Sequence, residues 1–253
     1  MARPLRCLLS ALAAITVATA SHADEPFLLD HQQQTIEGWT VHVDTRLLPS
    51  GEEPTSASRL GSRAIRLLKN KLYELTFVLP DDRCRDLRTI PIFLDLDHPL
   101  QRMQYHPNIN WLREHNYDPA MAKAVHIPSV HHFLDIVGGY RQPSAVLHEL
   151  AHAYHDQFLG FDEPRVRIAQ EKIAQGGRYE SVLHISGRMR RHYALTNHKE
   201  FFAEMSEAYL GTNDFFPFVR GELMDFDPDV ADLLHAIWLA EADETSSPAR
   251  EEE

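Results

Sequence analysis

Residues 142–160 read QPSAVLHELAHAYHDQFLG, and this stretch predicts a helix that carries two histidines on one face. Pro143 suits the first turn of a helix, and Gly160 follows where a left-handed residue commonly ends one. His148 and His152 are four residues apart, so their imidazoles lie on the same face, one turn from each other. Zinc takes neighbouring ligands in this geometry, and we interpret the pair as metal ligands.

Glu149 directly follows the first of these histidines in the segment HELAH. Its position on the helix lets the carboxylate reach a metal-bound water without being a ligand itself. Zinc lowers the pKa of such a water, so we predict that Glu149 takes its proton as general base. The alternative is a pair of core histidines that bind no metal. The apolar surroundings of the pair disfavour it, because buried imidazoles without a partner cost free energy.

A catalytic zinc site needs a third protein ligand. His155 lies a further turn along the same helix, about 10 Å from His148 by helix rise. Three histidines spread this far along one straight helix cannot all bind the same ion. The pattern of the metzincin class requires glycine at position 155 and histidine at position 158. This chain has His155 and Phe158 there, which excludes that class.

Residues 196–211 (TNHKEFFAEMSEAYLG) predict a second helix, capped by Asn197 and ended by Gly211. Glu200, Glu204 and Glu207 fall on one face of it, while aromatic and apolar residues cover much of the rest. A buried face with three carboxylates needs positive charge, which a zinc ion supplies. Spacing alone does not choose between Glu200 and Glu204 as the third ligand.

The remaining sequence predicts an α+β fold, with a small mixed sheet before the HELAH helix and a mainly helical C-terminal half. Residues 24–38 are expected to be irregular and residues 97–119 to form a long loop. Pro91 suggests that the strand containing it lies at an edge or a bulge. We predict strands over 39–48, 87–96 and 122–128, helices over 56–78, 163–175 and 230–239, and a hairpin over 179–195.

The N-terminus predicts a signal peptide over residues 1–23. Two arginines precede an apolar run, and small residues lie before Asp24. We therefore expect an exported protein, periplasmic or extracellular, that does not insert in a membrane after cleavage. Residues 24–242 would form one domain and the acidic residues 243–253 a disordered tail. The formal net charge of −12 argues against nucleic acid as a partner, and the oligomeric state is not indicated. Cys84 is interpreted as an incidental surface cysteine.

The pairing of HELAH with the later segment YALTNHKEFFAE (residues 193–204) resembles the catalytic domain of anthrax lethal factor and its relatives. These proteins are zinc-dependent peptidases of the gluzincin type with a zincin-like fold. The resemblance covers about a tenth of the chain, and this chain lacks the large accessory domains of lethal factor.

The resemblance implies a role for each matching residue. One zinc ion would be held by His148, His152 and Glu200, with Glu149 as general base. Tyr193 would donate a hydrogen bond to the transition state, as a phenol beside zinc is suited to do. Glu204 would orient a ligand histidine from outside the ligand set. The resemblance also suggests that residues 122–128 form an edge strand along the substrate cleft. An ordinary sheet edge is the alternative.

The function predicted from these residues is hydrolysis of peptide bonds in a peptide or protein substrate. Two alternatives stay open. One is an exported zincin-like module that binds a partner without catalysis, and the intact Glu149 counts against it. The other is a zinc hydrolase of a non-peptide amide or ester.

Overall fold

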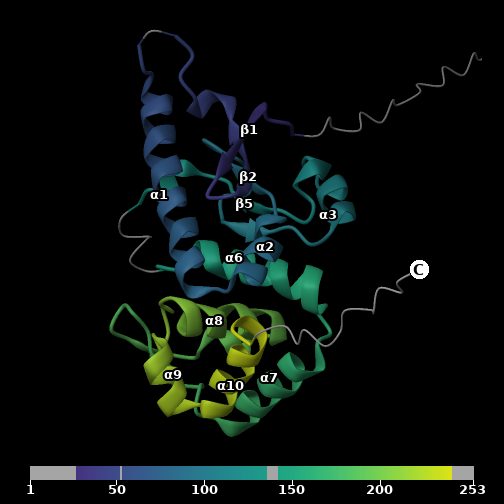
Figure 1. The fold of residues 1–253 in the computed structure, drawn as a ribbon, viewed down its shortest axis with the longest axis vertical. Helices are drawn as coiled ribbons and strands as arrows, with labels where there is room; N and C mark the ends of the chain where they lie inside the picture. Colours follow the sequence, from purple (N-terminus) through teal and green to yellow (C-terminus); the bar gives the residue numbers. More distant parts are fainter. Residues whose placement is uncertain (1–26, 52, 136–141, 241–253) are drawn as a thin grey trace, which may run out of the picture.

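The structure is a computed structural model that describes residues 27–51, 53–135 and 142–240. In this part of the chain a five-stranded sheet and a long helix precede a mainly helical half (Figure 1). The predicted α+β class with a small mixed sheet is therefore confirmed.

The sheet has the strand order β1-β2-β3-β5-β4. Strands β1 and β2 form an antiparallel pair, β2, β3 and β5 run parallel, and β4 pairs antiparallel with β5 at the edge. All residues of β3 and β5 are buried, which suits strands that are covered on both faces. The bounds are His31–Ile36 (β1), Trp39–Asp44 (β2), Ile92–Leu94 (β3), Gln104–Tyr105 (β4) and Val125–Ile127 (β5).

Helix α1 spans Ser56–Val78, as the sequence predicts. The Thr55 side chain caps it by accepting a hydrogen bond from the Ser58 N–H at 3.0 Å. Apolar residues at helical spacing form its buried face, which packs against the short 3-10 helix η1 (Thr45–Leu47) and helix α6. At Gly61 this packing is so close that a Cβ atom would lie 2.1 Å from the Leu47 carbonyl oxygen.

Helix α6 (Ala145–Tyr154) contains the HELAH segment and continues as a short π-helix, η3 (His155–Leu159). Gly160 follows with φ of 82°, so the prediction that it ends the helix with a positive φ is confirmed. Figure 1 shows α6 between the sheet with α1 and the cluster of later helices. It contacts α1, β4 and β5 on one side and α8 (His198–Leu210) on the other.

The other predicted helices also occur, as α7 and α10, and the predicted hairpin is reduced to two short strands, β6 and β7. The sequence did not predict α2, α3, α4 and α9. The bounds are Asp81–Arg88 (α2), Ile109–Glu114 (α3), Pro119–Met121 (η2), Val130–Phe133 (α4), Pro164–Gly176 (α7), Val182–Leu183 (β6), Met189–Arg190 (β7), Tyr193–Leu195 (η4), Arg220–Phe226 (α9) and Pro228–Trp238 (α10).

Four expectations about this half of the chain are wrong. Strand β3 begins after Pro91 and lies between β2 and β5, so proline does not mark an edge there. The strand within 122–128 is also internal, because β4 pairs with its outer edge. Both β4 and helix α3 come from residues 97–119, the segment expected to be a loop. The strand β1 lies within the segment expected to be irregular, and its outer residues are polar because only one neighbour covers it.

Cys84 does not lie on the surface. It is a buried residue of α2 and part of the hydrophobic core, where burial raises the pKa of its thiol. The polar residues around it occupy the other faces of this helix.

The predicted signal peptide (1–23) and acidic tail (243–253) lie outside the described residues. Among the helices in the described ranges, none is long and apolar enough to span a membrane.

Gly61→Ala should lower the free energy of unfolding by about 3 kcal/mol, because the added methyl group meets backbone at η1 that cannot move aside cheaply. Gly221→Ala is the control, since a Cβ atom there meets nothing within 4 Å and alanine favours a helix. Urea denaturation measures both. A Gly61→Ala midpoint equal to that of the wild type would contradict this packing.

Candidate metal centre

Helix α6 brings His148 and His152 together on the face that meets α8. Their Nε2 atoms are 3.1 Å apart. His148 is buried and His152 is half-buried. Apart from Glu149, the other residues of α6 are mainly apolar and pack into the core, which fixes the backbone that carries both imidazoles.

Helix α8 supplies Glu200 to the same point. Its Oε2 atom lies 3.3 Å from His148 Nε2 and 3.4 Å from His152 Nε2. The Asn197 side chain caps α8 and accepts hydrogen bonds from the N–H groups of Lys199 and Glu200, so the helix begins at a fixed residue. The three atoms therefore form a triangle with sides between 3.1 and 3.4 Å.

This triangle fits a tetrahedral metal ion. With bonds of about 2.0–2.1 Å, zinc holds its ligand atoms about 3.3 Å apart. Two imidazole nitrogens and one carboxylate oxygen form a donor set that zinc accepts. The described residues thus include a His/Glu cluster with the geometry to bind a metal, and its members are His148, His152 and Glu200.

A second carboxylate orients His148 from outside this triangle. Its Nδ1 atom lies 2.6 Å from Glu207 Oε1, which places Glu207 to accept a hydrogen bond from Nδ1 and would leave Nε2 to bind a metal ion. Glu204, predicted for this role, has Oε1 3.7 Å from the same nitrogen, which is too far for a hydrogen bond. Glu207 belongs to the glutamate face visible in the sequence, but spacing did not assign it this contact.

Charge is concentrated at this point. Burial lowers the pKa of His148, but hydrogen bonds with Glu200 and Glu207 outweigh burial and raise it well above its ordinary value. Burial acts to raise the pKa of Glu200, and the two histidines bring it down to about 2. Burial raises the pKa values of Glu204 and Glu207. The Oε2 atoms of both have no hydrogen-bond partner among the described residues. Such a cluster is stabilised by a cation.

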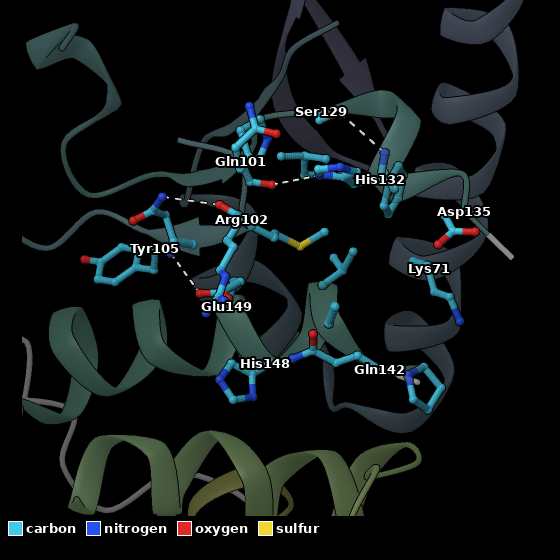
Figure 2. Close-up of a pocket in the computed structure, with 18 of the residues that line it drawn as sticks. Lys71, Gln101, Arg102, Tyr105, Ser129, His132, Asp135, Gln142, His148 and Glu149 are labelled. Atoms are coloured by element: carbon cyan, nitrogen blue, oxygen red, sulfur yellow. Dashed lines mark hydrogen bonds between the residues drawn. The ribbon is translucent and has the colours of Figure 1, made fainter. Parts of the chain in front are cut away.

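Glu149 points from α6 toward the sheet and lines the same cavity as His148 and His152. Its Oε2 atom accepts a hydrogen bond from the Tyr105 N–H of β4 at 2.8 Å (Figure 2). The side chain is buried, and burial raises its pKa, as suits a carboxylate that takes up a proton. The sequence contained no sign of this backbone contact, because it depends on where β4 lies.

Tyr193 is on η4, just before α8, and the residue is 46% exposed. The prediction that places it in a hairpin strand is therefore wrong. It lines one cavity of about 1050 Å³ together with His148, Glu149, His152 and Glu200. Burial and the charge of Glu200 raise the pKa of its hydroxyl, which keeps it a hydrogen-bond donor.

The cavity extends from these residues along the β4 edge. Figure 2 shows Arg102 above Glu149, with Gln101 and His132 further along the same wall. Residues from α1, the segment before β4, α4 and α6 line it. Tyr193 and Glu200 from the helical half line it as well, so the two halves of the fold meet there.

Comparison with known proteins finds no matching family model, no similar curated protein and no similar solved structure.

His155 takes no part in the cluster. It is fully buried between Phe161 and Phe202, with ring centroids 5.3 and 4.9 Å away. Neither ring nitrogen has a hydrogen-bond partner among the described residues. Burial, followed by the nearby His198, lowers its pKa to about 4, so the ring is neutral.

His155→Phe should raise the free energy of unfolding by about 1 kcal/mol near pH 7.5, because an unsatisfied buried polar group is removed. The gain should grow below pH 6.5. There the unfolded chain takes up a proton that the folded His155, with its pKa of about 4, does not. Urea denaturation at pH 7.5 and pH 5 measures this. His131→Phe, at an exposed position, is the control. A gain that is equal at both pH values would contradict the neutral burial of His155.

Proposed function

We propose that this chain is a zinc-dependent peptidase of the gluzincin type with a zincin-like fold. The observation that carries the proposal is the triangle of His148, His152 and Glu200 beside a buried carboxylate in a large cavity. The short resemblance to the lethal factor family, over HELAH and residues 193–204, supports the same assignment.

The residues present fit zinc. His148 and His152 would hold the ion through their Nε2 atoms and Glu200 through a carboxylate oxygen, and all three residues line the cavity from which water and substrate would reach it. A zinc ion bound here would lower the pKa of a water molecule and polarise a carbonyl group. Glu207 holds the His148 ring in the tautomer that binding needs.

Glu149 takes the proton from the attacking water on a carboxylate oxygen and passes it to the leaving amine. The Tyr105 N–H donates a hydrogen bond to Oε2 of Glu149 and so holds this carboxylate in position. The Tyr193 hydroxyl, which remains protonated, donates a hydrogen bond to the oxygen that becomes negative as the scissile carbonyl is attacked.

The substrate we propose is a peptide or protein segment in an extended conformation. An edge strand, β4, runs along the cavity wall, and the cavity continues past Arg102 on that side. A folded protein would have to offer a loop or terminus to enter. We also propose that the protein acts after export, as the basic and apolar N-terminal residues suggest.

Glu149→Gln should keep the metal and lose cleavage of a peptide library by about 10²–10⁴-fold, because only the proton acceptor is removed. His148→Ala should lose one equivalent of zinc and cleavage together. Elemental analysis and mass spectrometry of the products measure the two effects. If His148→Ala keeps the zinc content of the wild type, the metal assignment fails. If Glu149→Gln remains active, the assignment of the base fails.

Tyr193→Phe should lower kcat by about 10²–10³-fold on a substrate found in that library, since one donor to the transition state is lost. The zinc content and KM should stay near the wild-type values, because Tyr193 is not one of the cluster residues His148, His152 and Glu200 that would hold the ion. Equal kcat values for variant and wild type would remove Tyr193 from the mechanism.

A further inference from the structure

A second cluster of metal-binding residues lies in the sheet half of the fold. Asp95 follows β3, His126 is in β5 and His98 is in the segment between β3 and β4. All three are buried, and each offers a ligand atom within 4.8 Å of the other two. None of them lines the cavity that contains His148 and Glu149.

Other histidines hold two of these residues in position. Asp95 Oδ2 lies 2.8 Å from His126 Nε2, and Asp95 Oδ1 lies 2.7 Å from His31 Nε2. The other ring nitrogen of His126 lies 3.2 Å from His106 Nε2. Asp95 and His126 thus each have a neighbour on the far side that fixes their orientation, which is the usual arrangement around metal-bound imidazoles and carboxylates.

We propose that Asp95, His98 and His126 bind a second divalent transition metal ion of the zinc type. Two imidazoles and one carboxylate suit Zn²⁺, Co²⁺ or Ni²⁺, and they are a poor set for Ca²⁺ or Mg²⁺, which prefer oxygen ligands. The ion would take the place of the proton that Asp95 Oδ2 and His126 Nε2 share.

The electrostatics of the cluster suit a cation. Asp95 is a fully buried carboxylate, and its hydrogen bonds with His126 and His31 outweigh burial and bring its pKa to about 2, so it is charged. Burial lowers the pKa of His98 to about 4 and that of His106 to about 3, so these rings are neutral and keep lone pairs. The buried Asp95 carboxylate therefore lies close to the neutral His98 ring.

This site should bind metal more weakly than the first. The Leu100 N–H donates to His98 Nδ1 at 3.1 Å, and a metal would compete with this hydrogen bond for the ring. The ion would tie the segment after β3 to β5. Strand β4 pairs with β5 and holds Glu149 through Tyr105, so the second metal would stiffen the wall of the first site without entering its chemistry.

The experiment is titration of the metal-free full chain with Co²⁺, followed by calorimetry and by the visible absorption of bound Co²⁺. We expect two equivalents in the wild type, the second bound at least tenfold more weakly. His98→Ala should bind one equivalent, His148→Ala one, and the double variant none. His131→Ala, an exposed histidine outside both clusters, should bind two.

One equivalent in the wild type that a folded His98→Ala protein still binds would overturn the proposal, whereas one equivalent that His98→Ala loses and His148→Ala keeps would overturn only the metal assignment of the proposed function. Two equivalents in a folded His98→Ala protein would also overturn it. His98→Gln replaces that variant if circular dichroism shows His98→Ala to be unfolded. If His148→Ala binds two equivalents and His98→Ala binds one, the metal assignment of the proposed function fails while this proposal stands.

Discussion

The contact between α6 and α8 is the interaction on which the rest of the structure depends. Every residue of α8 from Phe201 to Leu210 is buried, so Glu204 and Glu207 have no access to bulk water, whereas Glu200 is half-buried at the cavity. Charged groups in such a place must satisfy one another, and three carboxylates against two histidines leave a deficit of positive charge. The apolar packing of the two helices thus forces together side chains that a metal ion would stabilise.

Helix α6 also joins this contact to the sheet. His148 lies on the face toward α8, whereas Glu149 reaches the backbone of Tyr105 in β4. Neighbouring residues of one helix therefore depend on different halves of the fold. A metal ligand is held by carboxylates of the later helices, and the candidate base is held by an edge strand. The cavity lies where these halves meet.

The sequence predicted those elements whose own residues show a full hydrophobic spacing or a clear helix cap. Helix α1 has matching bounds because its apolar spacing runs over its whole length, and α8 begins at the Asn197 cap that its sequence displays. Strand β4 was missed because two residues carry no periodicity. The role of Glu207 was missed for another reason, since a choice among three glutamates on one face requires the crossing of α6 and α8.

Histidine is the residue whose environment the sequence indicated least. The chain has 16, and the fold gives chemically identical rings opposite properties. His148 meets a carboxylate 59 residues away and its pKa rises, whereas His155, two turns along the same helical stretch, meets aromatic rings and its pKa falls. His126 finds Asp95 31 residues away, across neighbouring parallel strands. In each case the neighbouring residue decides whether the imidazole can act as a metal ligand, and tertiary packing determines which residue is the neighbour. Spacing within one helix can therefore place two imidazoles side by side, but only the fold supplies the carboxylates that make them ligands.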